Sequence, residues 1–271
     1  MKDQNTPEGK KGFLQNDKLL VCSMLTFYGL CIVGVIAGAF IWLGDRAETT
    51  NINATATRVM IATEEANVTA TAKARIAEHD KYDYIERFDK NSGLWFVGAY
   101  EKRYGDIQIT IKDGTYIWDI LDAKTFTQST EFQKENMIGD FDVYMDLKFV
   151  ESSLLGDTCS GLFFRLPTDD WNDGVYTFVI CDDAHYEIQF YEKNKWHPIT
   201  YSDYENSIQN SDWNRIEISA RRDHFIFTIN NTVVFEMNDE RLKYGSLGIF
   251  NMLEQNGSAE IWFDNFGFQR R

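Results

Sequence analysis

The stretch GLFFRLPTDDWNDGVYTFVIC, residues 161–181, predicts two strands joined by a turn-rich loop. Its flanks, GLFFRL and VYTFVIC, are short and rich in aromatic and β-branched residues, which favour strands. The loop between them contains the proline, aspartate, asparagine and glycine that turns use. We therefore predict an antiparallel hairpin whose register centres on Asp170. In that register Cys159 and Cys181 lie directly opposite, within disulfide range. Two buried free thiols are the alternative.

Short apolar runs continue on both sides of this hairpin. Residues 141–149 alternate apolar and polar side chains, which predicts a strand with one buried face. Tight-turn signals such as Asp113-Gly114 and Asn230-Asn231 separate the runs. Many short strands at hairpin spacing predict an all-β antiparallel sandwich. The other predicted strands are 107–111, 115–121, 186–192, 214–220, 225–230, 232–237, 246–250 and 260–268.

A different pattern occupies the N-terminal part of the chain. Leu19–Leu43 contains no charged residue and, at about 1.5 Å per residue, is long enough to cross a bilayer as a helix. Four lysines precede it within residues 1–18, so the positive-inside rule predicts a cytoplasmic N-terminus and an extracellular C-terminal domain. A cleaved signal peptide is the alternative, but the apolar run is longer than a signal core. We predict a single-pass protein of the cell membrane.

The segment after the span is rich in alanine and threonine and carries a weak heptad pattern. It predicts a helical stalk, with a disordered spacer as the alternative. Gly34 and Gly38, four residues apart in the span, would allow two helices to approach closely, which would give a homo-oligomer through span and stalk. The alternative is that these small residues are incidental, because glycine is frequent in membrane helices. The predicted organisation is a cytoplasmic tail (1–18), a transmembrane helix (19–43), a stalk (44–83) and an extracellular domain (84–271).

The charge of the chain restricts its partners. The formal net charge is −15, and it lies almost entirely after residue 43. An acidic domain repels phosphate backbones, so no nucleic-acid partner is expected. The sequence also lacks a G-x-S-x-G motif and a P-loop, and its four histidines lack zinc-ligand spacing. Several enzyme classes are thereby disfavoured.

Several segments carry a family resemblance. They are GLFFRLPTDDWNDGVYTFVI, YEIQFYEKNKWHPI, NSIQNSDWNRIEISARRDHFIFTINNTVVFEM, YGSLGIF and IWFDNFGF. Together they resemble the concanavalin A-like jelly-roll superfamily. In particular they are similar to the laminin-G-like and DUF1080 (3-keto-disaccharide hydrolase-like) domains of bacterial surface proteins. The resemblance implies a jelly roll over residues 85–271. It leaves the function open, because lectins, adhesion modules and hydrolases share this fold.

Candidate catalytic residues are few. Glycoside hydrolysis needs two carboxylates at a fixed separation. The Glu-x-Asp-x-x-Glu motif of laminarinase-type relatives is absent, which leaves Asp146 and Glu187 as candidates that would converge on a polar sheet face. Acidic residues that are merely solvated are the alternative.

Candidate binding residues follow from how jelly rolls bind sugars, with flat aromatic rings beside polar groups. Trp171 lies in the loop Thr168–Gly174 and is the first candidate. We expect the other ligand-binding residues to line one sheet face beside it: Tyr144, Arg165, Tyr176, Gln189 and Tyr191.

A structural calcium ion is the cofactor that the resemblance implies. The resemblance implies a site where the terminal strand meets the first segment, with Asp264 as a ligand and Phe88-Asp89 as that segment. The alternative is that Asp264 caps a turn or pairs with a neighbouring basic residue.

Three functional hypotheses follow. The first is a membrane-anchored extracellular recognition module that binds a glycan or another cell-surface ligand without catalysis. The second is a surface enzyme resembling a glycoside hydrolase. The third is a structural or oligomerisation protein of the cell surface.

Overall fold

The computed structural model describes residues 59–61, 63, 64, 66 and 81–271, apart from 101–104, 124, 125, 133–136, 154, 254 and 255. The chain divides into two units, residues 1–73 and 74–271, and every described strand lies in the second. The described residues of the first unit are helical and fall within the predicted stalk. The predicted span, Leu19–Leu43, lies outside the described residues. Among those that are described, no helix is long and apolar enough to cross a membrane.

The described part of the second unit consists mainly of strands and includes a short 3-10 helix. The strands are β1 (Tyr84–Glu86), β2 (Gly98–Ala99), β3 (Gly105–Lys112), β4 (Thr115–Ala123), β5 (Phe126–Glu131), β6 (Phe141–Ser152), β7 (Thr158–Leu166), β8 (Val175–Cys181), β9 (Tyr186–Glu192), β10 (Lys195–Ser202), β11 (Asn214–Arg221), β12 (His224–Ile229), β13 (Thr232–Asn238), β14 (Ser246–Leu253) and β15 (Gly257–Arg270). The 3-10 helix is η2 (Trp171–Asp173).

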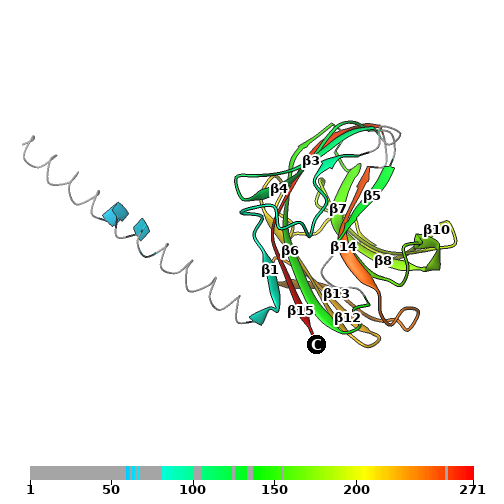
Figure 1. Ribbon diagram of the computed structural model, residues 1–271. Helices are drawn as coiled ribbons and strands as arrows, with labels where there is room; N and C mark the ends of the chain where they lie inside the picture. The colour runs from blue at the N-terminus through cyan, green and yellow to red at the C-terminus, as the bar shows by residue number, and fades with distance from the viewer. Residues whose placement is uncertain are drawn as a thin grey trace, which may run out of the picture. The chain divides into compact units, whose positions relative to one another are not determined.

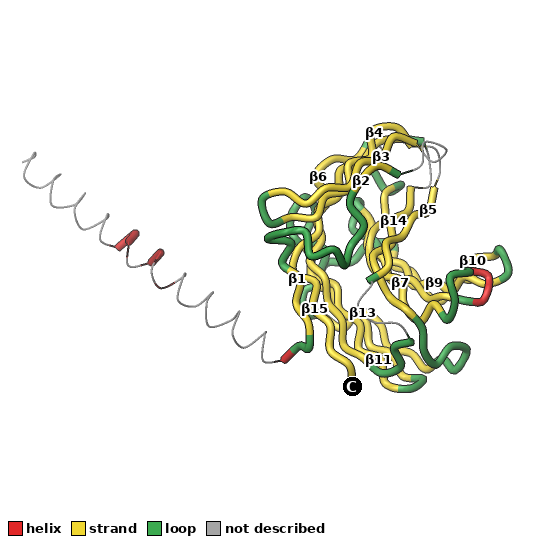
Figure 2. The backbone as a smooth tube through the Cα atoms, viewed as in Figure 1, coloured by secondary structure: helices red, strands yellow, loops and turns green. Residues whose placement is uncertain are grey.

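These strands form two antiparallel sheets that face each other, as Figures 1 and 2 show. Within the described residues, the nine-stranded sheet runs β13-β12-β11-β6-β15-β4-β3-β2, with β1 paired to β15. The six-stranded sheet runs β10-β9-β8-β7-β14-β5. The predicted antiparallel sandwich is confirmed.

The main core lies between the sheets because each strand turns alternate apolar side chains inward. In β6 the inward residues include Val143, Met145 and Leu147. In β9 they are Tyr186, Ile188 and Phe190, which belong to the same buried cluster. The polar residues that alternate with them therefore lie on the outer faces of the sheets.

The 161–181 hairpin has the predicted register. Cys159 pairs with Cys181 across β7 and β8, and a disulfide joins them. The turn residues Asp113 and Asn230 have positive φ, as tight hairpins require.

Four strands were not predicted. β10 contains Pro198 at a register shift and lacks apolar alternation, and β5 is largely polar. The other two, β1 and β2, are too short to give a periodic signal. β10 and β5 are the edges of the six-stranded sheet, where a strand has only one neighbour.

Candidate functional site

The outer face of the six-stranded sheet carries a second apolar cluster, separate from the main core. Its buried members include Phe163 of β7, Val179 of β8 and Phe250 of β14. Three half-buried aromatic residues, Trp171, Tyr191 and Trp196, pack against it. We call this surface the aromatic face. It is a second hydrophobic layer on the side of the sheet that faces away from the main core.

Trp171 is fixed over this face by its loop. Asp170 caps η2, and its carboxylate accepts a hydrogen bond from the Asn172 backbone N–H at 2.9 Å. The side-chain oxygen of Asn172 accepts from the backbone N–H of Asn194 at 2.7 Å. The carbonyl of Asn172 accepts from the N–H of Lys193 at 3.1 Å. The loop before β8 is thus tied to the β9–β10 turn, and Trp171 is held between them.

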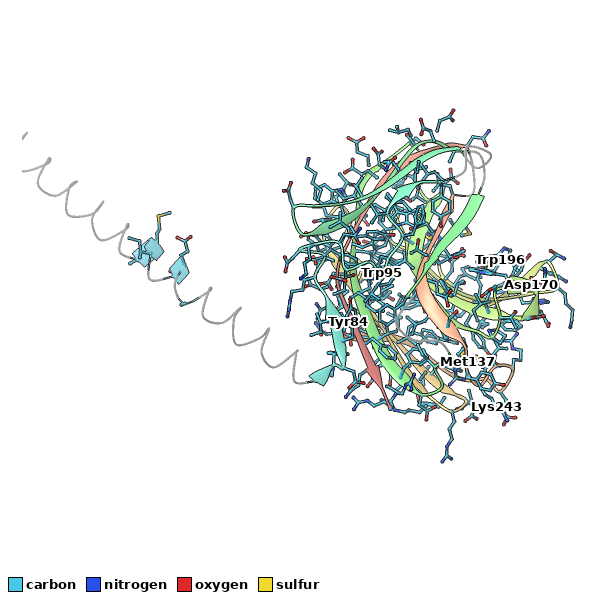
Figure 3. All side chains as sticks on the ribbon, in the orientation of Figure 1. Tyr84, Trp95, Met137, Asp170, Trp196 and Lys243 are labelled. Atoms are coloured by element: carbon cyan, nitrogen blue, oxygen red, sulfur yellow. A yellow bond between two sulfur atoms is a disulfide. The ribbon has the colours of Figure 1, made fainter. Side chains whose placement is uncertain are left out.

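The aromatic rings lie close to one another. The ring of Trp171 is 5.3 Å from that of Phe250 and 5.6 Å from that of Phe163. It stands edge-on to Trp196 and Tyr191, with centroids 6.2 Å away in both cases. Figure 3 shows Trp196 and Asp170 near each other at the β10 end of this sheet. The face therefore presents partly exposed rings whose positions are set by surrounding hydrogen bonds.

A polar cluster lies on the same face, in the β8–β9 turn and the first half of β9. It consists of Asp183, His185, Glu187 and Gln189. Glu187 faces Val179, and Gln189 faces Thr177, in the β8–β9 register. Because Ile188 points into the main core, Glu187 and Gln189 point outward.

The members of the polar cluster are hydrogen-bonded in a chain. Asp183 contacts His185 Nδ1, and His185 Nε2 lies 3.5 Å from the Glu187 carboxylate. The Gln189 amide donates to the other Glu187 oxygen. The side chains of His185 and Glu187 remain 17% and 18% exposed, so a ligand in solution can reach them.

His185 carries an altered pKa. Its hydrogen bond to Glu187, supported by Asp183, raises the pKa of the imidazole to about 9, against the opposing effect of burial. The histidine is therefore a cation at neutral pH. Its ring is within 4.8 Å of the sulfurs of Cys159 and Cys181. Those sulfurs are joined in the disulfide and do not supply thiolate ligands for a metal.

The two parts of this surface suit carbohydrate. Aromatic rings can stack against the C–H faces of a sugar, and carboxylate and amide groups can bond its hydroxyls. Glu187 and Tyr191 lie on one strand, about 13 Å apart along it at strand rise. That distance exceeds one sugar ring.

The predicted binding residues divide into two groups. Trp171 and Tyr191 belong to the aromatic face, and Gln189 lies in the polar cluster on the same side of the sheet. The prediction is wrong for Arg165 and Tyr176, which are 1% and 0% exposed. Arg165 donates to the carbonyls of Leu242 and Gly139, and Tyr176 packs against the ring of Phe164.

Tyr144 and Asp146 lie in the other sheet, on β6. Tyr144 is buried beneath Tyr82 and the guanidinium of Arg215. Asp146 accepts two hydrogen bonds from Arg215, at 2.6 and 2.9 Å. The expectation that Asp146 and Glu187 converge is therefore wrong, because they belong to different sheets.

Asp264 lies opposite Asp146 at a bulge in β15. Its carboxylate accepts from the backbone and side-chain N–H groups of Asn265, at 2.7 and 3.1 Å. The Asn265 amide also donates to Asp146 at 3.0 Å. Asn265 thus bridges the two aspartates, and a calcium ion at Asp264 stays a prediction.

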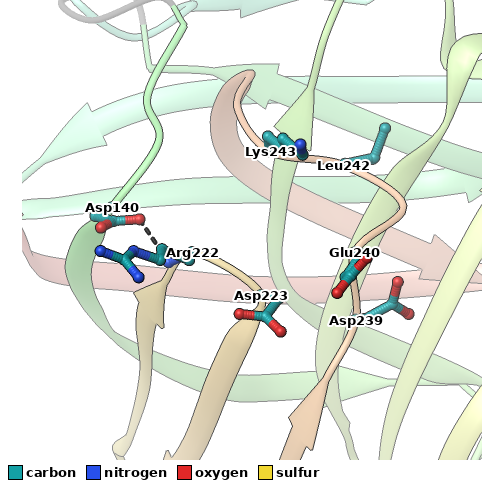
Figure 4. Close-up of a pocket in the computed structure, with 7 residues that line it drawn as sticks. All are labelled: Asp140, Arg222, Asp223, Asp239, Glu240, Leu242 and Lys243. Carbon is teal, nitrogen blue, oxygen red and sulfur yellow. Dashed lines mark hydrogen bonds between the residues drawn. The ribbon is translucent and has the colours of Figure 1, made fainter.

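A cavity of about 390 Å³ lies elsewhere, at one end of the sandwich. Figure 4 shows its lining: Asp140, Arg222, Asp223, Asp239, Glu240, Leu242 and Lys243. Asp140 is bonded to the Arg222 N–H at 2.6 Å, and Asp239 pairs with Arg241. The lining contains no aromatic ring, so it does not offer the stacking surface that the aromatic face has.

Three residues of the site were missed from the sequence, namely Trp196, His185 and Asp183. Trp196 lies on the unpredicted strand β10, where it is paired with Tyr191 of β9. His185 lacks zinc-ligand spacing, and Asp183 precedes the predicted strand 186–192. The period-two spacing of His185, Glu187 and Gln189 was a usable signal, since it places all three on one side of a strand.

A family model described as a 3-keto-alpha-glucoside-1,2-lyase-like domain matches residues 66–269. The chain belongs to this family. The match covers all but the last residue of the strands and agrees with the resemblance drawn from the sequence. No curated protein matches the chain.

Solved structures share the jelly roll of this lyase-like domain. One, described under endo-acting O-glycanases of the human gut microbiota, has a TM-score of 0.53 and 9% identity over 70% of this chain and 99% of its own. A family 16 endo-glucanase from Bacteroides ovatus has a TM-score of 0.51 and 8% identity over 68% and 99%. A laminarinase catalytic domain from Thermotoga petrophila has a TM-score of 0.50 and 7% identity, over 70% of this chain and 98% of its own. Identities this low establish the fold alone.

Proposed function

We propose that the lyase-like domain binds a carbohydrate on its aromatic face and acts as a recognition module. The observation that carries the proposal is that Trp171, Tyr191 and Trp196 gather on one surface beside Glu187 and Gln189. Partly exposed rings beside hydrogen-bonding groups are the usual means of sugar recognition. The family and the fold, which is shared with glycan-acting proteins, add support.

A glycan array probed with the full chain tests this proposal. We expect binding to a restricted set of oligosaccharides. Repeating the array with calcium and with a chelator separates sugar binding from any dependence on a metal ion. Absence of binding to every glycan under both conditions would contradict the proposal.

The second candidate is an enzyme acting on a glycoside at the same face. The Asp183–His185–Glu187 chain favours it, because it places a carboxylate beside a proton-carrying imidazole. This candidate predicts turnover of glycosides, including 3-keto glucosides, that Glu187→Gln abolishes. Asp146→Asn is the matched control, since Asp146 pairs with Arg215 in the other sheet. Turnover that Glu187→Gln leaves unchanged would remove Glu187 as the catalytic group.

The location of the domain is also a proposal. Leu19–Leu43 supports a membrane anchor, with the lyase-like domain displayed outside the cell and copies paired through Gly34, Gly38 and the stalk. Protease added to intact cells should degrade the domain and spare residues 1–18. Full protection in intact cells would contradict the orientation. Cross-linking that yields only monomer would contradict pairing.

A further inference from the structure

The proposed recognition module uses Glu187 and Gln189 of the polar cluster and assigns no role to His185 and Asp183. Glu187 is held from both sides, with one carboxylate oxygen facing His185 at 3.5 Å and the other bonded by Gln189. His185 is in turn held by Asp183, whose carboxylate also accepts the His185 backbone N–H at 3.4 Å. The imidazole therefore has one carboxylate at each ring nitrogen, and its orientation is fixed.

We propose that His185 is a positioning residue that holds Glu187 as a hydrogen-bond acceptor, so that this end of the face selects uncharged sugars and rejects acidic ones. The inference rests on the proposed carbohydrate binding and names the class of sugar. It assigns no proton transfer to His185.

The acceptor capacity of Glu187 supports the selection of hydroxyl donors. An ionised carboxylate has about four lone-pair sites and no proton to donate. Gln189 and His185 each approach one oxygen, which leaves further sites turned toward solvent. Sugar hydroxyls can donate to these sites, and hydrogen bonds to a charged acceptor are the stronger kind.

The charge of the cluster supports the rejection of anions. Asp183 and Glu187 carry two negative charges against the single positive charge of His185. The imidazolium is already engaged by both carboxylates and cannot pair with a ligand anion without breaking one contact. A sugar carboxylate or sulfate placed here would meet an acceptor-only group of like charge.

The position of His185 is set by the fold. Cys181 and His185 bracket the β8–β9 turn, where the Cys181 N–H donates to the His185 carbonyl at 2.9 Å. The disulfide between Cys159 and Cys181 lies beside the ring, and these sulfurs do not titrate. The charged groups acting on the imidazole are Glu187 and Asp183.

The test compares two probes on the full chain by calorimetry. One is a neutral oligosaccharide that binds on the array, and the other is the same oligosaccharide oxidised to its uronic acid. We expect the wild type to bind the neutral form at least tenfold more tightly. His185→Gln should weaken neutral binding about tenfold, while His197→Gln, on β10 beside Glu192, should leave it unchanged. Glu187→Gln should bring the affinities for the neutral and the acidic oligosaccharide closer together.

The outcomes separate the two proposals. Equal binding of both probes by the wild type, or unchanged neutral binding by His185→Gln, overturns this inference and leaves carbohydrate binding standing. Failure of the wild type to bind any oligosaccharide overturns the proposed function and this inference with it. Circular dichroism establishes that each variant is folded. If His185→Gln does not fold, the ratio measured for Glu187→Gln decides, and an unchanged ratio overturns the inference.

Discussion

Gly267 of β15 lies against the ring of Tyr144. A Cβ atom at this position would meet ring atoms of Tyr144 at 1.9 to 2.7 Å. Gly267→Ala should therefore displace a buried side chain and lower the free energy of unfolding by roughly 1–3 kcal/mol, the usual range for overpacking. Denaturant unfolding measures the change. Gly139→Ala is the control, because its added Cβ would make only an ordinary contact at 3.7 Å. Equal stability of the two variants would contradict this packing.

His185 makes stability depend on pH. Its pKa rises from an ordinary value of about 6.5 to about 9 in the folded domain. A raised folded-state pKa gives a stabilisation that is fully present below the unfolded pKa and lost as pH rises through the folded one. The melting temperature should therefore fall between about pH 6.5 and pH 9 by more in the wild type than in His185→Gln. An equal change of melting temperature with pH in the two proteins would contradict the pairing of His185 with Asp183 and Glu187.

At the residue scale, the sequence predicted the members of the site that keep to strand periodicity. Gln189 and Tyr191 alternate with Ile188 and Phe190, so their shared face could be predicted. Arg165 could not be placed, because it has positive φ at a break in the β7–β14 register. Alternation fails at such a bulge, and the side chain turns into the core.

At the scale of elements, the disulfide links β7 to β8. It closes a loop with a sequence separation of 22 residues. Replacing both cysteines with alanine should lower the free energy of unfolding by about 3 kcal/mol in the chain-entropy model. Guanidinium unfolding under non-reducing conditions measures this effect. Stability equal to that of the wild type would contradict a structural role for the disulfide. Wild type treated with a reductant provides the matched comparison.

The hairpin register and the sandwich could be predicted because their strands carry a strong apolar period. The edge strand β10 could not be, since it has Pro198 and few inward-facing apolar residues. The failure to predict β10 affects the candidate site, because β10 supplies Trp196 beside Tyr191. Edge strands are under weaker burial constraints, so sequence patterns specify them poorly.

At the scale of the whole molecule, the sequence could not place the candidate site on one sheet. The expected groups came from both sheets, and no period shows which strands share a sheet. Sheet membership follows from long-range pairing, such as β6 between β11 and β15. That pairing separates Asp146 from Glu187. The composition of the N-terminal part predicts the anchor and the stalk. Protease treatment of intact cells and cross-linking test them.

The central claim is that sugar binds on the aromatic face, and the affinity of Trp171→Ala tests it most directly. Calorimetric titration of the full chain with an array-positive oligosaccharide should show about tenfold weaker binding for Trp171→Ala, equivalent to about 1.4 kcal/mol. Trp213→Ala should bind like the wild type, because Trp213 lies beside Trp262, away from the aromatic face. Equal affinity of wild type and Trp171→Ala, or a loss confined to Trp213→Ala, would contradict the account.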